Sequence, residues 1–439
     1  MGEFFMDVRK LDTYEEKWRE IEERIGDETG KNVVRALKEL YSIYDDRMVE
    51  WMASLYDPKA GAWYHSRSGQ ATEGYGPDAE STIAVFQFLE ATGMTGGKPY
   101  TEVTPKWLRD KVANFCYHLQ DPDGYFYHPQ WGKQYYIDNS LYSRRSRDSE
   151  WCERLIGKFS DGRLKYPLPA ENLKAGGEKL KEVPERWRSV ENYKKYLYGL
   201  DLKNRSYHVG NTLLAEAPER KAYSEALGAN LDEITLEHLD KNVSPKTGLW
   251  QAGGDTSYYA VNALCKITHV YNRGAHPMKY AKEGIRASMK SILSDERAGS
   301  VTDTLNPWSS IANGISNIRH YHSDGASLAC EMLHEVYEWA PRGIIKTAEK
   351  IAGFKMPDGG MSYSLSGFCP TSQGAPVAIS GSREGDINGN CCASCATIQY
   401  VFKALSIEDI TIPLFDESDL KHFFEIVTAR ENEWLASKR

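Results

Sequence analysis

The chain has 439 residues, of which 41% are apolar, 12% aromatic and 26% charged. This is the composition of a globular protein with a sizeable core, and the length fits two or three average domains or one large domain built from repeats. The formal net charge of −8, without a long run of Lys and Arg, argues against a nucleic-acid-binding protein.

Targeting signals and disulfides are not apparent in the sequence. No stretch approaches the roughly 18–20 consecutive apolar residues of a membrane-spanning helix. The first residues lack the basic and apolar regions of a secretory signal. The eight cysteines are scattered, several of them within apolar helical patterns, which indicates reduced thiols rather than a disulfide framework. The sequence therefore predicts a cytoplasmic protein that has neither nucleic acid nor membrane as a partner.

Four segments share one pattern, in which a proline is followed by a glycine and then by an aromatic residue or methionine. They are residues 56–64, 120–127, 243–250 and 355–363. Two of the intervals between them are about twice the other one, which fits a repeat of roughly 55–65 residues with degenerate copies. One such repeat holds two helices and their loops, so the pattern predicts stacked helical hairpins.

Hydrophobic periodicity predicts helices along most of the chain. They lie within residues 12–55 and at 81–89, 107–119, 231–239, 258–267, 323–339, 344–354 and 391–405. Residues 128–205 depart from the pattern because they are rich in Lys, Arg, Glu and Tyr and are broken by Pro and Gly. They are predicted to form an irregular insertion with a helix near 191–200. Strand-type alternation is scarce, so little sheet is expected.

The helices fall into two classes. Those that follow the long loops are almost entirely apolar or small, which indicates complete burial; they include 81–89, 258–267, 326–333 and 393–401. Those that precede the turns mix charged and apolar faces, as an outer layer does. We therefore predict a single all-α domain over residues 1–439, an (α/α) barrel of about six helical hairpins with the insertion at 128–205.

This alternation of buried and half-exposed helices resembles the α/α toroid of six-hairpin glycosidases, toroid polysaccharide lyases and terpenoid cyclases. Residues 63–66, 77–82 and 372–377 are most similar to bacterial carbohydrate-active toroids. The resemblance concerns architecture over most of the chain. It implies an enzyme that acts on an oligosaccharide or another small polar ligand at a mouth formed by the loops before the inner helices. The Asp-rich motif and acidic tetrad of terpenoid cyclases are not found, although a terpenoid-cyclase-like protein stays an alternative.

The densest polar segment is 313–324, which the pattern places in a loop just before a buried helix. β-Elimination from a uronate needs a group that neutralises the carboxylate, a base for the proton at C5 and an acid for the leaving oxygen. Asn317 or Arg319 can supply the first, His320 or His322 the second and Tyr321 the third. Toroid lyases are known for this set of residue types. The segment thus predicts a lyase, and the alternative is that its side chains only cap the helix.

A second group consists of carboxylates near predicted helix starts. Asp78 and Asp255 come from different hairpins and are predicted to face each other across the mouth, with Glu80 nearby as a substrate ligand. Inverting glycoside hydrolases separate two carboxyl groups by roughly 6.5–9.5 Å to admit a water. Glu384 and Asp386 are further members of this group. The alternative is ordinary N-capping, for which Asp and Glu are also favoured.

Aromatic residues offer a third possibility, a cleft that stacks sugar rings. The candidates for substrate binding are Trp131, Tyr136, Trp250 and Tyr258. A cleft with such rings but without an acid–base pair would make the chain a non-catalytic glycan-binding toroid. Cys391, Cys392 and Cys395 lie close together, but no second close pair completes a zinc site, so neither metal nor cofactor is predicted. They are interpreted as small residues at a tight helix start, and a redox pair is the alternative.

Overall fold

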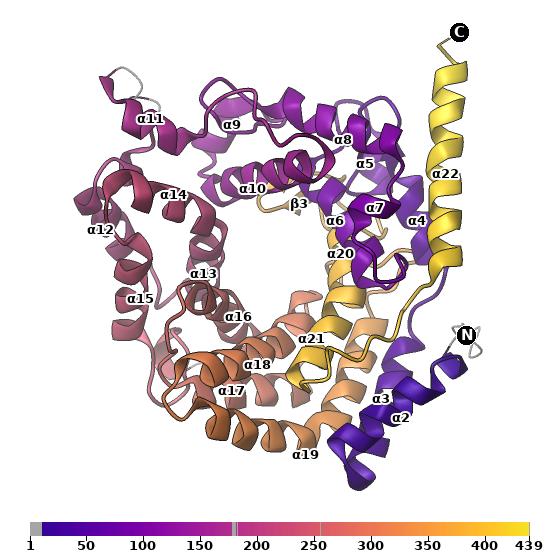
Figure 1. The fold of residues 1–439 in the computed structure, drawn as a ribbon, viewed down its shortest axis with the longest axis vertical. Helices are drawn as coiled ribbons and strands as arrows, with labels where there is room; N and C mark the ends of the chain where they lie inside the picture. Colours follow the sequence, from indigo (N-terminus) through magenta and orange to yellow (C-terminus); the bar gives the residue numbers. More distant parts are fainter. Residues whose placement is uncertain (1–10, 178–180, 182, 255, 439) are drawn as a thin grey trace.

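The computed structural model describes residues 11–177, 181, 183–254 and 256–438. Helices dominate it and follow one another around a ring (Figure 1). The strands of the described residues form two short antiparallel hairpins, which agrees with the small sheet content expected. They are β1 (Tyr56–Asp57) with β2 (Ala62–Trp63), and β3 (Thr371–Ser372) with β4 (Ala375–Pro376).

An inner ring of helices surrounds the centre of the view in Figure 1. α6 packs against α10, α10 against α13, α13 against α16, α16 against α18 and α18 against α21, while α20 returns to α6. The bounds are α6 (Ala79–Ala91), α10 (Tyr142–Phe159), α13 (Ser206–Ala215), α16 (Tyr258–Arg273), α18 (Thr302–Tyr321), and the continuous run α20 (Ile387–Cys391), η4 (Cys392–Ala396) and α21 (Thr397–Ala404).

An outer layer of helices covers this ring. α8 packs on α10, α17 and α19 pack on α18, and α3 packs on α19. The main outer helices are α3 (Asp27–Tyr41), α8 (Lys106–Leu119), α14 (Ala217–Leu227), α15 (Leu231–Asn242), α17 (Ala281–Leu293) and α19 (Gly325–Ala352). At the ends of the chain, α2 (Glu15–Ile25) lies on α3, and α22 (Glu417–Ala436) lies on α4 (Arg47–Ser54).

Shorter helices fill the connections: α5 (Arg67–Ala71), α7 (Tyr100–Val103), α9 (Gly132–Asp138), α11 (Pro169–Ala175), η2 (Glu185–Trp187), α12 (Val190–Tyr198) and η3 (Ala252–Gly254).

The repeated turn seen in the sequence has a common structure. In the first copy Tyr56 pairs with Trp63 across the β1–β2 hairpin, and in the second and fourth copies Gln120 bridges Phe126 and Lys355 bridges Met361. The glycine is required in the first copy, where Gly61 has φ of +75° and a Cβ there would lie 2.6 Å from Lys111 Cβ. The residue after the glycine is then directed into the core, so the repeat is an architectural feature.

Most predicted helices are present near their expected places, but three predictions were wrong. Residues 323–339 and 344–354 belong to one helix, α19, which continues through Pro341. Residues 326–333 were expected to be fully buried, yet many of them are exposed because α19 is an outer helix. The inner helix of this region is α18, whose polar C-terminal half, residues 313–321, had been predicted as a loop.

The predicted insertion at 128–205 is more regular than its composition suggested. It contains α9 to α12, and α10 is a member of the inner ring. α10 was missed because its first half buries Arg144, Arg145 and Asp148, so its buried apolar residues begin only at Cys152. In the described part of the chain, every helix is too short or too polar to cross a lipid bilayer.

Candidate functional site

The residues predicted for a lyase site lie at the C-terminal end of α18. Asn317 is fully buried there. Its side-chain oxygen accepts a hydrogen bond from the Met278 amide at 2.8 Å, and its nitrogen donates to Asn272 Oδ1 at 2.8 Å and to the His276 carbonyl at 2.9 Å. These bonds satisfy the amide completely and tie α18 to the end of α16.

The other predicted lyase residues, at positions 319–322, lie in different environments. Arg319 and His320 are exposed. Arg319 donates to Ser406 Oγ at 3.2 Å, and His320 Nδ1 lies 2.8 Å from the Ser316 carbonyl of its own helix. Tyr321 donates to the Asn272 carbonyl at 3.3 Å, and His322 is half-buried after the helix end. The structure does not bring these side chains together around one position.

The carboxylates predicted for a hydrolase are enclosed. Arg144, with no exposed surface, lies 3.0 Å from Asp78, 2.7 Å from Glu80 and 2.9 Å from Asp148. Asp78 also caps α6 by accepting bonds from the amide and hydroxyl of Ser81. Burial acts to raise the pKa of Asp78, but the positive charge of Arg144 and the hydrogen bonds from Ser81 oppose it, and that pKa lies below its usual value. Asp255 lies outside the described residues.

Glu384 and Asp386, the two other acidic residues of this group, also accept structural hydrogen bonds. Glu384 accepts a hydrogen bond from Ser66 Oγ at 3.1 Å and one from the Ser68 amide at 2.7 Å. Asp386 caps α20 by accepting from the Gly389 amide at 2.7 Å. Glu384 therefore joins the segment after β2 to a loop that is about 320 positions away in the chain, while Asp386 holds the start of α20.

The aromatic candidates are packed inside the protein. Trp131, Tyr136, Trp250 and Tyr258 are 8%, 0%, 2% and 7% exposed. Their polar atoms donate to the Pro376 carbonyl, Asp148, the Leu239 carbonyl and the Glu296 carbonyl, at 3.0, 2.8, 2.9 and 3.0 Å. A ring that stacks on a sugar needs an open face, and these faces are covered by protein.

A different polar group lies on the inside of the ring, where α16, α18 and α21 meet. His269 Nε2 lies 3.4 Å from the Tyr400 hydroxyl, 3.4 Å from Asn313 Nδ2 and 3.5 Å from Ser309 Oγ. His269, Tyr400 and Asn313 are half-buried. We call these three residues, with Lys266 and Arg273, the interior cluster.

The interior cluster is strongly cationic. Burial, and then the charges of Lys266, Arg273 and Lys403, lower the pKa of His269 to about 4. The imidazole is therefore neutral at neutral pH and has a lone pair available. Burial raises the pKa of Tyr400, so its hydroxyl keeps its proton. A neutral base and a protonated acid thus lie beside each other.

A small hollow opens beside this cluster. It has a volume of about 180 Å³ and is lined by Arg147, Glu150, Leu214, Ala215, His269 and Arg273. Arg273 and Lys403 are in the last turns of their helices, where the helix dipole favours a cation. Arg147 donates to Asn211 Oδ1 at 2.8 Å. Glu150, whose carboxylate lies 3.9 Å from Arg273, also lines the hollow, where Arg147 and Arg273 outnumber it.

Part of the interior cluster has a signal in the sequence. Lys266 and His269 interrupt a helix that is otherwise almost wholly apolar, and that helix was expected to end at residue 267. A buried polar residue in an apolar helix needs a partner or a function. Tyr400 and Asn313 carried no comparable signal, because their proximity to His269 depends on how three helices pack.

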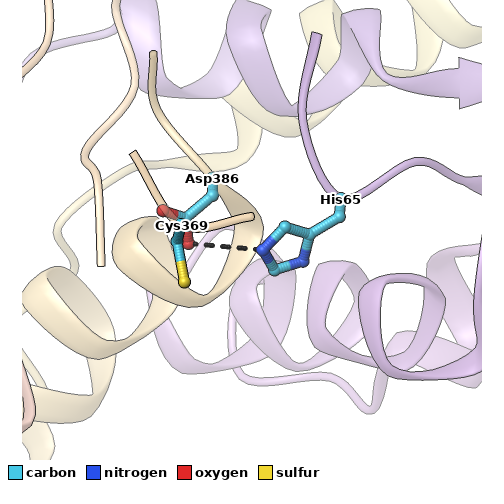
Figure 2. A group of neighbouring side chains, drawn as sticks. All are labelled: His65, Cys369 and Asp386. Atoms are coloured by element: carbon cyan, nitrogen blue, oxygen red, sulfur yellow. Dashed lines mark ion pairs between the residues drawn. The ribbon is translucent and has the colours of Figure 1, made fainter. Parts of the chain in front are cut away.

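Another group of side chains has donor atoms suited to a metal ion. His65, Cys369 and Asp386 place one nitrogen, one sulfur and one oxygen within 4.8 Å of each other (Figure 2). No metal centre was predicted from the sequence, because only Cys391, Cys392 and Cys395 lie close together along the chain. His65, Cys369 and Asp386 come from segments that are about 300 positions apart and meet only in the fold.

Comparison with known proteins gives no independent indication of function. No protein-family model matches the chain. No curated protein sequence is significantly similar to it.

Proposed function

We propose that the chain is an (α/α)-toroid enzyme of the carbohydrate-active type, a lyase that cleaves uronate-containing oligosaccharides by β-elimination inside the ring. The observation that carries the proposal is the interior cluster. A protonated phenol and an amide each lie 3.4 Å from one nitrogen of a neutral imidazole, with several cations nearby. These are the three chemical functions that uronate elimination needs.

The roles follow from charge and protonation. Lys266 and Arg273, with Asn313, neutralise the carboxylate of the uronate and so make the proton at C5 more acidic. His269 Nε2 takes that proton. The electron pair forms the double bond between C4 and C5, the C4–O bond breaks, and Tyr400 gives its proton to the leaving oxygen.

The positions of base and acid also fix the stereochemistry. His269 Nε2 and the Tyr400 hydroxyl are 3.4 Å apart, so both reach the sugar from the same side. The proton and the leaving group then depart from one face of the ring, which is a syn elimination. We expect cleavage only of linkages whose C5 proton and C4 oxygen lie on the same face.

The bound substrate also changes the base. In the free protein, burial and then the nearby cations keep the pKa of His269 far below its ordinary value. A carboxylate placed between them offsets their charge, so the pKa rises toward the range in which an imidazole is an effective base. Substrate binding therefore activates the residue that reacts.

Incubation with a panel of uronate oligosaccharides tests the proposal. The ultraviolet absorbance of the conjugated product and the release of reducing ends are followed together. We expect both signals to rise, and His269→Gln and Tyr400→Phe to slow them by about 10²–10⁴-fold. His320→Ala is the matched control, because its exposed imidazole is on the neighbouring helix.

Three outcomes would overturn the proposal. Loss of activity in His320→Ala but not in His269→Gln would move the base to the end of α18. New reducing ends without absorbance would identify a hydrolase. Binding of the oligosaccharides without either signal would identify a glycan-binding protein.

A further inference from the structure

His65, Cys369 and Asp386 converge at a second position that the proposed elimination does not use. His65 lies between β2 and α5, Cys369 lies in the loop before β3, and Asp386 is the N-cap of α20. Figure 2 shows the carboxylate and the thiol on the same side of the imidazole ring. The donor atoms lie within 4.8 Å of one another, and His65 Nε2 is 3.7 Å from Asp386 Oδ1.

The imidazole nitrogen that faces this position is unsatisfied. His65 is only 1% exposed, and its Nε2 has no hydrogen-bond partner within the described part of the chain. The 3.7 Å separation from Asp386 is too long for a hydrogen bond. Leaving a buried polar atom unpaired costs about 1–3 kcal/mol, so such an atom calls for an explanation. An ion held between the three side chains supplies one.

A Cys–His–Asp nucleophilic triad does not fit the same atoms. In a triad the imidazole uses one nitrogen for the carboxylate and the other for the nucleophile. Here Nε2 faces Asp386, while Nδ1 lies 3.4 Å from Ser81 Oγ. The Cys369 thiol lies 3.2 Å from the Thr371 carbonyl, to which it donates.

We propose that His65, Cys369 and Asp386 bind a divalent transition-metal ion of the zinc class. Nitrogen, thiolate and carboxylate are the ligands that zinc takes in proteins. Zinc–ligand bonds of about 2.0–2.3 Å place neighbouring ligands of a tetrahedron about 3.3–3.8 Å apart, so the His65–Asp386 pair is already at ligand spacing. Binding needs only a small approach of Cys369 and the release of its thiol proton. Three protein ligands leave the fourth position to a water or a ligand oxygen.

The surrounding hydrogen bonds hold two of the ligands in place. Asp386 accepts from the Tyr363 amide at 2.6 Å and from the Gly389 amide at 2.7 Å. The carbonyl of His65 accepts from the Ile387 amide at 3.0 Å, which joins the two ligand segments directly. Ser81 Oγ, which lies next to His65 Nδ1, is itself bound to Asp78 at 2.8 Å. Such contacts orient a metal-binding imidazole and set its tautomer.

The test is metal binding by the full chain, with Zn²⁺ and Co²⁺ as probes. After treatment with a chelator and gel filtration, the protein is titrated against a chromophoric competitor for Zn²⁺. In parallel, Co²⁺ is added and the thiolate-to-cobalt charge-transfer absorbance is recorded. We expect one ion per chain, and loss of the charge-transfer absorbance with at least about tenfold weaker Zn²⁺ binding in Cys369→Ser and His65→Gln.

Controls identify the sulfur that is responsible. Cys330→Ser, an exposed position on the outer helix α19, is expected to bind like the unchanged protein. If the absorbance survives in Cys369→Ser and disappears in Cys392→Ser, the cysteines of η4 hold the ion and the proposal is wrong. Absence of Zn²⁺ binding in the unchanged protein also overturns it.

A measurement without substitutions covers the possibility that a variant does not fold. Alkylation of Cys369 is followed by peptide mapping, with and without Zn²⁺. We expect Zn²⁺ to slow alkylation of Cys369 at least about tenfold and to leave Cys330 unchanged. Equal alkylation of Cys369 in both conditions contradicts the proposal. None of these readouts depends on lyase activity, so the two proposals can fail separately.

Discussion

Arg144 is the residue around which one end of α10 is organised. Its guanidinium is bound to Asp78, Glu80 and Asp148 and has no exposed surface. It also lies over the Trp131 ring, with its central carbon 4.8 Å from the ring centre. Three carboxylates surround one buried cation, so the buried negative charges depend on Arg144 for their compensation.

Removing this cation should destabilise the protein strongly. We expect Arg144→Met to lower the free energy of unfolding by about 3–5 kcal/mol, because buried carboxylates lose their partner. Arg154→Met is the control, since Arg154 is on the same helix in a partly exposed pair with Glu150. It should cost at most about 1 kcal/mol. Urea denaturation of both variants measures the two changes in the free energy of unfolding. Equal changes would mean that the buried ion pairs of Arg144 stabilise the fold no more than the exposed pair of Arg154.

Asp148 should make stability depend on pH in an unusual direction. Burial raises its pKa from 3.8 to about 6, although Arg144 opposes the shift. The folded state then binds more protons than the unfolded state between these two pH values, so this residue destabilises the fold as pH rises through that window. The resulting loss in the free energy of unfolding is on the order of 2–3 kcal/mol, and it is complete just above pH 6.

The comparison with Asp148→Asn isolates this effect, since asparagine does not titrate. We expect the stability of the unchanged protein, relative to the variant, to fall between about pH 4 and pH 6 and then to stay level. Asp78→Asn should show the opposite slope at lower pH, because the pKa of Asp78 is lowered. A rising difference for Asp148 between pH 4 and pH 6 would contradict the account.

At the scale of elements, the packing of α20 against residues 361–363 depends on one glycine, Gly389. A Cβ on Gly389 would lie 2.1 Å from the Met361 carbonyl oxygen and 2.5 Å from the Tyr363 nitrogen, both of which are backbone atoms. The close approach lets the 361–363 segment pack on the start of α20, where Asp386 accepts the Tyr363 amide. The inner ring and the loop that carries Cys369 are joined here.

Two glycine-to-alanine substitutions should therefore change the free energy of unfolding in opposite directions. Gly389→Ala has to displace backbone, and we expect it to cost at least about 2–3 kcal/mol. Gly157→Ala lies in α10, where an added Cβ meets nothing within 4 Å. It should stabilise the protein by about 0.5–1 kcal/mol, because alanine is the better helix former. Thermal unfolding monitored by circular dichroism tests both, and a neutral Gly389→Ala would refute the packing argument.

The elements that the sequence predicted well are those with local signals. Residues 81–89 have a clear N-cap and an apolar core, and they form α6. The Pro–Gly turns were recognised because their chemistry is contained in a few adjacent residues. α10 and α18 were missed because polar residues are buried among their apolar ones and obscure the apolar periodicity. The buried polar residues include Arg144, Arg145 and Asp148 in α10 and Asn306, Ser309, Ser310 and Asn317 in α18.

At the scale of the whole molecule, the distribution of charge is uneven. The chain has a formal net charge of −8, yet Arg147, Lys266 and Arg273 lie together inside the ring. Positive side chains inside an acidic protein create a local positive electrostatic potential, which attracts a small anionic ligand. This arrangement supports a uronate over a neutral sugar as the substrate.

The residue types of a uronate lyase were predicted from the sequence, but the structure gathers such a set elsewhere. His, Tyr, Asn and a cation were expected within residues 313–324, where they are neighbours in the chain. In the interior cluster the same types come from α16, α18 and α21. Only Asn313 belongs to both groups. Spacing along a sequence cannot reveal a site whose members meet through helix packing.

The most direct test of the account is the pKa of His269, measured by NMR of a protein with labelled histidines. The imidazole signal is assigned with His269→Gln and titrated with and without a uronate oligosaccharide, with Tyr400→Phe used to prevent cleavage. We expect a pKa of about 4 in the free protein, set by burial and the nearby cations. Bound uronate should raise it by one unit or more, at about 1.4 kcal/mol per unit. An ordinary pKa in the free protein, or a shift at His320 instead of His269, would contradict a uronate site inside the ring.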